Sequence, residues 1–546
     1  MNWQDHLVIA PIVLPLVAGA TMLLLDGRSR TVAAVLNLAS TFALLAIAIN
    51  LVMTSAGTDP AAAVKVYRLG DWPAQFGIVL VADRLSSLML LLTAILACSA
   101  LVFSLARWHR AGSHFHPLFQ FLLMGLNGAF LTGDLFNLFV FFEVLLAASY
   151  GLALHGSGPA RVRAGLHYIA VNLVAALAFL VGVSLIYGAA GTLNMADLAA
   201  RIPGLPARER ALLEVGTSIL GVAFLVKAAT WPLGFWLPGT YAAASAPVAA
   251  LFSVMTKVGI YAVLRLGFLL AGPEVAAGSA QFGGSWLLAG GVATVIFAMI
   301  GMLAAQDLAK LASFGVVVSS GTMLAVIGAN DPAIIGASLY YLVSSTLAIG
   351  AFFLLVELIE RGRAPADDVL AVTLEAYGIE DEEEPGEDSD AGVAVPAMLG
   401  VLGAAFIACA LLLSGLPPLS GFVAKFAILA GALAGSVPAN GSGVPLVAWT
   451  LVALLLLSGF VTLIAMVRAG IRSFWAVIER EAPRVRVIEL APVAILLFLC
   501  LTLTLQAGPA MRFMQVTAAG LDGSQAYIER VLAAPGAAPA AGGGRP

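Results

Sequence analysis

Three lysines lie inside apolar stretches that are long enough to cross a membrane. Lys227 and Lys257 lie in the stretch from 221 to 265, and Lys425 lies in a separate apolar stretch. Moving a cation to the centre of a bilayer costs at least about 2.5 kcal/mol unless it reaches water or a partner. A buried lysine can take up and release protons, because burial disfavours the charged amine. We therefore predict that these lysines face a partner, a cavity or an ion path.

A carboxylate lies at a similar depth in another apolar stretch. Glu143 follows Asp134 by nine residues, which places it about 13 Å into a helix and near the bilayer midplane. A glutamate and a lysine at matching depth can form an ion pair that opens and closes as protons pass. The alternative is a static salt bridge, but buried pairs stabilise a protein little once desolvation is counted. We favour a proton relay of Glu143 with Lys227 and Lys257 over a static pair.

Prolines interrupt the two apolar stretches that carry Lys227 and Lys425. Pro232 follows the first lysine, and Pro417 and Pro418 precede the second. Proline removes a backbone donor and clashes with the preceding turn, and such breaks are tolerated at membrane depth where protein or water satisfies the freed groups. Paired broken helices point to a transport path between two related halves. The alternative is two ordinary proline kinks.

Hydroxyl groups are the candidate proton carriers in the second half of the chain. Ser319, Ser344 and Ser345 lie in two apolar stretches with no ionisable residue at mid-span. Hydroxyls can hold a chain of water molecules, although each also commonly bonds to its own helix backbone. The six histidines and three cysteines do not have the spacing of a metal or redox site. We therefore predict no cofactor and no metal.

The composition places these residues in a multi-pass membrane protein. Of the 546 residues, 61% are hydrophobic and 11% are charged, with a mean hydropathy of +1.00, whereas soluble domains have about 25% charged residues. The alternation of a barrel is missing, so helices are expected. The predicted fold class is an all-α polytopic membrane protein with about 14 transmembrane helices. The expected spans are 7–25, 32–53, 84–106, 115–132, 134–154, 164–188, 217–236, 246–270, 285–304, 308–328, 333–358, 397–429, 447–468 and 488–506.

Basic residues concentrate in alternate loops, and the positive-inside rule makes those loops cytoplasmic. They include Arg28, Arg30, Arg107, Arg110, Arg161, Arg163, Lys310, Arg361, Arg363, Arg468 and Arg472. Both ends of the chain then face outward from a bacterial plasma membrane. The outward loop 54–83 is expected to fold over the outer face. The net charge of −4 gives no reason to expect nucleic acid.

One long hydrophilic insertion, 361–395, contains the acidic run EDEEEPGEDSD from Glu380 to Asp390. Like charges repel and the segment lacks apolar surface, so we expect a solvated loop. A docking surface or a patch that concentrates cations is the alternative. Residues from Ala533 onward have low complexity and are expected to be unstructured.

Five blocks of the sequence resemble a family of antiporter-like membrane subunits. These blocks are LFNLFVFFEVLLAASYGL, LVKAATWPLGFWLP, ALFSVMTKVGIYAVLR, AAQDLAKLASFGVVVSSG and SGLPPLSGFVAKF. The family is shared by respiratory complex I and the multisubunit Mrp-type cation/proton antiporters. The resemblance covers roughly residues 70–470, with the blocks in the expected order. The blocks around Glu143 and Lys257 are most similar to the D subunits of Mrp-type antiporters.

The resemblance implies two inverted five-helix repeats, broken helices 7 and 12, and a polar axis along the membrane plane. Glu143 would tune Lys227, Lys257 would link the halves, and Lys425 would be the terminal exchange lysine. The implied domains are 1–114 with helices 1–3 and the outer loop, 115–270 as the first repeat, 283–470 as the second repeat with the insertion 361–395, and 471–546 with helix 14 and the tail.

Three departures favour the Mrp-type branch over complex I. Gly234 stands where many complex I relatives have a histidine after the helix 7 proline. Ser319 stands at the histidine or glutamine position of helix 10. Ser345 and Ile349 stand at the positions of the histidine/lysine pair of helix 11. The acidic insertion is not part of the family pattern.

The implied function is that of a proton-translocating subunit of a heteromeric monovalent cation/proton antiporter, with Na⁺ as the expected cation. Such a subunit is a secondary transporter and not an enzyme. Its partners would be other membrane subunits, the lipid bilayer, H⁺ and the cation, without nucleic acid. The alternatives are a proton-pumping subunit of complex I or of a membrane-bound hydrogenase, and a scaffold subunit that transports nothing.

Overall fold

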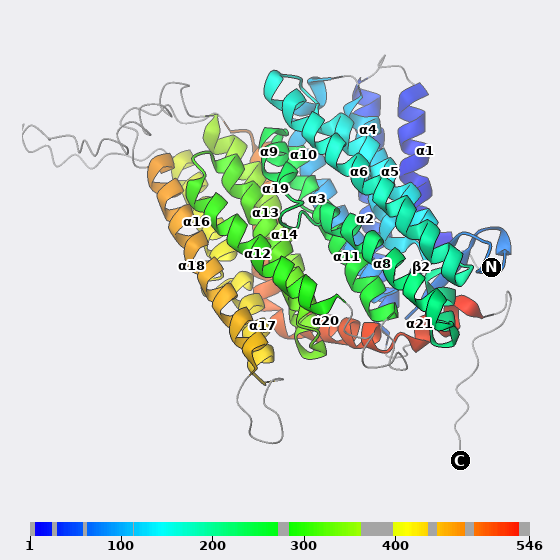
Figure 1. Ribbon diagram of the computed structural model, residues 1–546. Helices are drawn as coiled ribbons and strands as arrows, with labels where there is room; N and C mark the ends of the chain where they lie inside the picture. The colour runs from blue at the N-terminus through cyan, green and yellow to red at the C-terminus, as the bar shows by residue number, and fades with distance from the viewer. Residues whose placement is uncertain are drawn as a thin grey trace, which may run out of the picture.

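The computed structural model describes residues 6–24, 30–57, 63–112, 114–270, 283–361, 397–434, 445–474 and 485–533. Within these residues the chain is a bundle of helices with a short β-hairpin at one end (Figure 1). The acidic insertion predicted at 361–395 lies outside the described residues from 362 onward. The low-complexity tail lies outside them from 534 onward.

The helices of the bundle are the predicted membrane-crossing elements. Among the described residues, 11 helical segments are long and apolar enough to cross a membrane, and α1, α4 and α17 are shorter apolar helices. The all-α polytopic class is therefore confirmed, while the number of about 14 spans stays a prediction. The helices of the bundle are α1 (Ala10–Leu24), α2 (Arg30–Ser55), α3 (Arg84–Ser104), α4 (Phe115–Leu131), α5 (Leu135–Ala153), α6 (Pro159–Ala190), α8 (Ala207–Lys227), α9 (Trp236–Ala243), α10 (Ala246–Phe252), α11 (Met255–Leu270), α12 (Gly284–Ala304), α13 (Leu308–Gly328), α14 (Pro332–Glu360), α16 (Ala397–Ser414), α17 (Ser420–Ala434), α18 (Leu446–Phe474) and α19 (Val487–Leu505).

One end of the bundle carries the β-hairpin and is called here the hairpin face. Strands β1 (Lys65–Arg68) and β2 (Val79–Ala82) pair antiparallel, and the short helix α7 (Met195–Arg201) lies at the same end. His6 Nδ1 lies 3.2 Å from Tyr67 Oη, and Arg68 donates to the carbonyl of Ala533 at 2.6 Å. Both ends of the described chain therefore lie at the hairpin face, on the same side of the bundle.

The opposite end gathers arginines and is called here the arginine face. Trp108 Nε1 donates to Glu357 Oε2 at 2.7 Å, and Arg361 donates to Glu489 Oε1 at 2.5 Å, which ties the end of α14 to the start of α19. Arg468 donates to the carbonyl of Ala305 at 3.3 Å at the same end. The positive-inside rule predicts that this face is cytoplasmic.

Two helices after α19 were not anticipated from the sequence. Helix α20 (Ala507–Asp522) runs along the hairpin face across the ends of α14 and α11, and α21 (Gln525–Leu532) ends beside β1 (Figure 1). Arg68 donates to the carbonyl of Val531 at 2.9 Å, so it caps the C-terminus of α21. We call α20 and α21 together the C-terminal strap, because they join the second half of the chain to the first.

Candidate functional site

The first predicted break lies directly after Lys227, in the middle of the bundle. Helix α8 ends at this lysine, and α9 resumes beyond Pro232. Ala229 has a φ of 56°, and the amide of Thr230 donates to the carbonyl of Leu225 at 3.0 Å. This is the Schellman pattern, in which amides beyond the helix end satisfy its last carbonyls. The carbonyls of Leu225 and Val226, two of those freed at the end of α8, are thus satisfied within the protein.

The second break has the same local geometry. Gly415 has a φ of 78°, and the amide of Leu416 donates to the carbonyl of Leu411 at 3.0 Å. Pro418 follows Gly415 by three residues, as Pro232 follows Ala229. The two broken helices therefore end with the same local geometry, as two related repeats would. The inverted repeats and their boundaries stay a prediction.

Glycine lets the chain cross closely over each broken end. A Cβ atom at Gly234 would lie 2.1 Å from the carbonyl oxygen of Ala229, and one at Gly421 would lie 2.0 Å from the carbonyl oxygen of Leu412. Neither position can hold a larger residue without movement of the backbone. The space beside Gly234 is thus filled by the backbone of Ala229.

Lys227 is buried, and its Nζ has no hydrogen-bond partner among the described residues. It lies 5.7 Å from the centroid of the Phe142 ring, a distance at which a cation is attracted to the ring face. The expected ion pair with Glu143 is open, because no contact within 4.0 Å joins the two among the described residues. The two groups still interact through their charges.

Glu143 lies at the edge of the bundle, between its interior and its outer surface. It is half-buried and shares a face of α5 with Phe136, which is 53% exposed, and Val140, which is 41% exposed. Residues spaced by three, four and seven lie on one side of a helix. A carboxylate on a membrane face needs a proton, a partner or water, so this face fits a contact with another membrane subunit.

Lys257 is fully buried at the boundary between the two predicted halves. Its Nζ donates to Ser319 Oγ at 2.8 Å, and Ser319 Oγ lies 2.9 Å from Ser345 Oγ. Its helix α11 also crosses the end of α8, because a Cβ at Gly259 would lie 2.7 Å from the amide nitrogen of Ala228. Lys257 therefore lies beside the first broken helix and bonds into the second half.

A small cavity lies where the serine pair meets the second break. It leaves about 10 Å³ for the centre of a water molecule, close to the ~10–15 Å³ that one water needs. Ser344 Oγ lies 2.8 Å from Ser420 Oγ at the start of α17. The cavity wall includes Ser319, Ser344, Ser345, Ile349, Leu413 and Gly421. The structure thus brings the three predicted serines together around one water-sized space.

Lys425 is held on the last turn of α16. Its Nζ donates to the carbonyls of Ser414 at 2.9 Å and Leu413 at 3.4 Å. A cation at this place satisfies unpaired carbonyls and complements the helix dipole. Gly459 leaves room for the amine, since a Cβ there would lie 3.3 Å from Nζ. Lys227 precedes its break and Lys425 follows its own, so the two lysines are not equivalent in the two halves.

A second charged pair, near the hairpin face, was not anticipated from the sequence. Arg265 on α11 contacts Asp83, the N-cap of α3, through bonds of 2.5 and 2.8 Å, and it donates to Tyr261 Oη at 3.1 Å. Burial alone would raise the pKa of the Asp83 carboxyl, but the Arg265 charge lowers it below its usual value. The available signal was spacing, because Arg265 follows Lys257 by eight residues on one helix face.

Comparison with known proteins connects this arrangement to a family. Residues 132–374 match the family described as NADH:quinone oxidoreductase/Mrp antiporter, TM. A protein of Rhizobium meliloti (strain 1021), named as the D subunit of a probable K⁺/H⁺ antiporter, is 57% identical over 98% of this chain and 99% of the relative. The D subunit of a Na⁺/H⁺ antiporter of Bacillus subtilis (strain 168) is 34% identical over 97% of this chain and 100% of the relative.

A solved structure extends the likeness to three dimensions. A chain of the Mrp complex from Dietzia sp. DQ12-45-1b superimposes with a TM-score of 0.81 at 26% identity, covering 97% of this chain and 100% of that chain. The residues predicted for the relay, the two broken helices and these full-length matches lead to one assignment. The chain belongs to the family of D subunits of the multisubunit, Mrp-type cation/proton antiporters.

Proposed function

We propose that this chain carries protons for a multisubunit antiporter that exchanges a monovalent cation for H⁺. Glu143, Lys227, Lys257 and Lys425 are its proton-exchanging groups, and Ser319, Ser344 and Ser345 hold the water between them. The observation that carries the proposal is the hydrogen-bonded series from Lys257 through Ser319 to Ser345. That series ends on a cavity whose wall includes Leu413, and the carbonyl of Leu413 also accepts a bond from Lys425.

The arrangement supports proton exchange for a physical reason. An ammonium group in an apolar interior is costly unless it is compensated, so a lysine there gives up its proton readily when its partner changes. Lys227 has a ring face and the charge of Glu143 nearby but no hydrogen bond among the described residues. Movement of Glu143 toward or away from this amine would therefore change its proton affinity.

Glu143 supports the association with further membrane subunits. Its face of α5 is open to the surroundings, and a carboxylate is unstable against acyl chains. We infer that another subunit covers this face in a bacterial plasma membrane, with the arginine face in the cytoplasm. The chain then acts as part of a secondary transporter that ion gradients drive.

The cation is proposed from the relatives. The relative at 57% identity is named for K⁺, and the relatives at 34% and 32% identity are named for Na⁺. The higher identity supports K⁺ over the Na⁺ expected from sequence alone. In everted vesicles that contain the whole complex, the half-saturating concentration of K⁺ for exchange with H⁺ should be lower than that of Na⁺. A lower half-saturating concentration for Na⁺ would reverse this assignment.

The relay is tested by lysine substitution in the assembled complex. Lys227→Ala, Lys257→Ala and Lys425→Ala should each abolish antiport in everted vesicles, while the tagged chain still copurifies with its partners. Lys310→Ala is the matched control, because Lys310 is exposed and pairs only with Asp307 at 2.7 Å among the described residues. Full transport by the Lys425→Ala variant would favour the scaffold alternative. Copurified iron–sulfur and flavin proteins would favour a redox-driven complex.

A further inference from the structure

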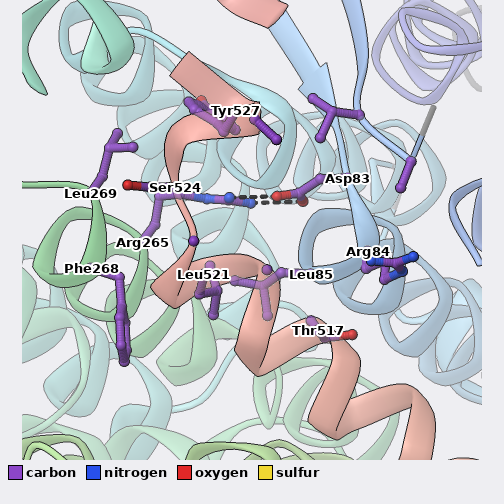
Figure 2. A pocket seen from close by; sticks show the side chains of 15 residues that line it. Asp83, Arg84, Leu85, Arg265, Phe268, Leu269, Thr517, Leu521, Ser524 and Tyr527 are labelled. Carbon is purple, nitrogen blue, oxygen red and sulfur yellow. Dashed lines mark hydrogen bonds and ion pairs between the residues drawn. The ribbon is translucent and has the colours of Figure 1, made fainter. Parts of the chain in front are cut away.

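A cavity opens at the hairpin face between α3, α11 and the C-terminal strap (Figure 2). It leaves about 70 Å³ for the centres of water molecules, several times the ~10–15 Å³ that one water needs. Its wall includes Asp83, Arg265, Phe268, Thr517, Ser524 and Tyr527. Neither the lysine relay nor the second-half cavity shares a residue with this wall.

The wall of this cavity contains a buried ion pair between Asp83 and Arg265. Arg265 and Asp83 face each other through two parallel bonds (Figure 2). The guanidinium also lies 5.2 Å from the Tyr527 ring of the strap and 5.3 Å from the Tyr261 ring. A buried ion pair contributes little net stability, and ionisable groups at membrane depth mark ion pathways more often than packing sites.

The same face of α11 connects this pair to the relay. Lys257, Tyr261 and Arg265 follow one another at intervals of four residues, so each lies one turn beyond the last. Tyr261 Oη accepts a bond from Arg265 and donates to the carbonyl of Phe130 at 2.6 Å. On α3, Ser87 lies one turn inside Asp83, and its buried Oγ has no partner among the described residues.

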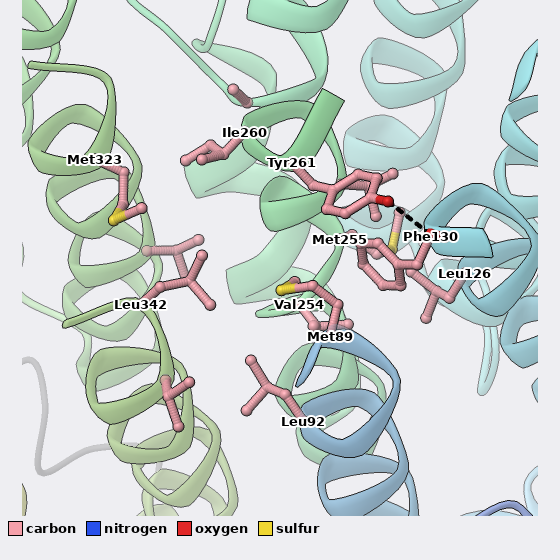
Figure 3. Close-up of a cluster of buried hydrophobic side chains, with 14 of the residues drawn as sticks. Met89, Leu92, Leu126, Phe130, Val254, Met255, Ile260, Tyr261, Met323 and Leu342 are labelled. Carbon is pink, nitrogen blue, oxygen red and sulfur yellow. Dashed lines mark hydrogen bonds between the residues drawn. The ribbon is translucent and has the colours of Figure 1, made fainter. Parts of the chain in front are cut away.

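Apolar side chains surround Tyr261, which lies on α11 between Arg265 and Lys257. The Phe130 ring packs edge-on against Tyr261 with 5.1 Å between the centroids, and Met89, Leu126 and Met255 belong to the same cluster of buried side chains (Figure 3). Methionine is flexible and re-packs readily, so a cluster that contains two methionines can admit water for short periods.

We infer that this cavity is the outer aqueous inlet through which protons reach Lys257, and that the Asp83–Arg265 pair with Tyr261 closes its inner end. The inference rests on the proposed relay and on the assignment of the hairpin face to the outside. Asp83, Arg265 and Tyr261 are positioning residues in this scheme, because they control access and the lysine exchanges the proton. Tyr527 holds the guanidinium from the strap side.

Cysteine accessibility tests the inlet without any transport measurement. In a chain whose three native cysteines are replaced, Ser524→Cys should react with a membrane-impermeant methanethiosulfonate added to whole cells, and should not react in everted vesicles. Thr346→Cys, fully buried on α14, is the control that should remain unmodified in both. Protection of Ser524→Cys in cells, or its modification only in everted vesicles, would overturn the inference.

A deeper cysteine tests the closure. Ser87→Cys, buried one turn inside Asp83, should be protected when Asp83 and Arg265 are intact, and should react at least about 10-fold faster in the Asp83→Asn/Arg265→Gln double variant, which removes both charges together. Equal reactivity in the two backgrounds would overturn the role of the pair. Copurification with the partner subunits shows that each variant is assembled, and the charge-exchanged variant Asp83→Arg/Arg265→Asp should recover protection.

Transport separates the inlet from the relay. Modification of Ser524→Cys should slow antiport by several fold, because the reagent fills the cavity. If the lysine variants abolish antiport but Ser524→Cys stays protected from outside, the relay holds and the inlet is wrong. If Ser524→Cys is modified but the lysine variants transport normally, the relay is wrong and the cavity does not serve it.

Discussion

Lys257 donates a hydrogen bond of 2.8 Å to Ser319, and this contact joins the last helix of the predicted first repeat to the second helix of the next. The amine is fully buried, so the serine is one of the few groups that compensate its charge. When Lys257 takes up a proton, its ammonium group therefore already donates a hydrogen bond to a residue of the predicted second half.

Removal of this serine hydroxyl should weaken transport without unfolding the chain. Ser319→Ala leaves the ammonium without its acceptor, and a hydrogen bond to a charged group is worth about 1.5–3 kcal/mol. We expect the antiport rate to fall by about 10-fold or more, measured as vesicle alkalinisation after cation addition. Ser313→Ala on the same helix is the control, because its hydroxyl donates to the carbonyl of Ala309 in its own helix. Equal rates for both variants would contradict the role of Ser319.

The first break should not tolerate a methyl group at its crossing point. Gly234→Ala would place Cβ 2.1 Å from the carbonyl oxygen of Ala229, so the chain would shift and move Lys227. We expect loss of antiport and a lower melting temperature of the purified complex. Gly239→Ala in α9 meets nothing within 4 Å of its Cβ among the described atoms and should behave like the parent. Unchanged antiport and an unchanged melting temperature in Gly234→Ala would mean that the chain does not cross this closely over Ala229.

A methyl group beside Lys425 should act mainly on transport. Gly459→Ala would put Cβ 2.7 Å from the carbonyl oxygen of Ser414 and 3.3 Å from Lys425 Nζ, and it would displace the amine from the end of α16. We predict a several-fold slower exchange with normal assembly. Gly400→Ala, on the open surface of α16, serves as the control. The prediction is refuted by unchanged exchange in Gly459→Ala.

The Asp83 carboxylate should stabilise the fold in a pH-dependent way. Arg265 lowers the pKa of Asp83 below its usual value of 3.8, so the ionised form favours the folded state. This stability is complete above the ordinary pKa and is lost as the pH falls below it toward the lowered folded-state value. Asp83→Asn should therefore reduce the melting temperature at pH 7 and have less effect near pH 3. A difference that does not shrink on acidification would contradict this assignment.

The open face of α5 should contact another subunit. A photoreactive amino acid at Val140, 41% exposed, should crosslink to a partner in the assembled membrane complex. The same group at Phe142, 2% exposed on the inner side, should crosslink only within the chain. Crosslinks from Val140 to lipid alone would mean that Glu143 lacks a protein partner.

Much of the candidate site could be predicted because its residues are exceptional in an apolar sequence. Lys257 stands out against its neighbours, and a proline such as Pro232 cannot continue a helix, so position in the sequence alone indicated both. The hydroxyl path was also indicated, since Ser319 lies in a span that has no ionisable residue at its centre. These inferences depend on one helix at a time.

Relations between distant elements could not be predicted in the same way. Asp83 and Arg265 are 182 residues apart, and each taken singly is an ordinary residue at the end of a span. The state of the Glu143–Lys227 pair depends on which side of α5 faces inward, which an almost uniformly apolar helix does not reveal. Helix α20 was missed because it lies along the face and contains polar residues on one side.

The C-terminal strap has a consequence for biogenesis. Helices α20 and α21 follow every spanning helix of the described chain, so they leave the ribosome after the bundle has been inserted. Until then Arg68 lacks the carbonyl of Val531, and Arg265 lacks the Tyr527 ring. A nascent chain that stops after α19 would contain every spanning helix that the structure describes and yet leave this face uncovered. Docking of the strap is thus the step that closes the hairpin face over Arg68 and Arg265.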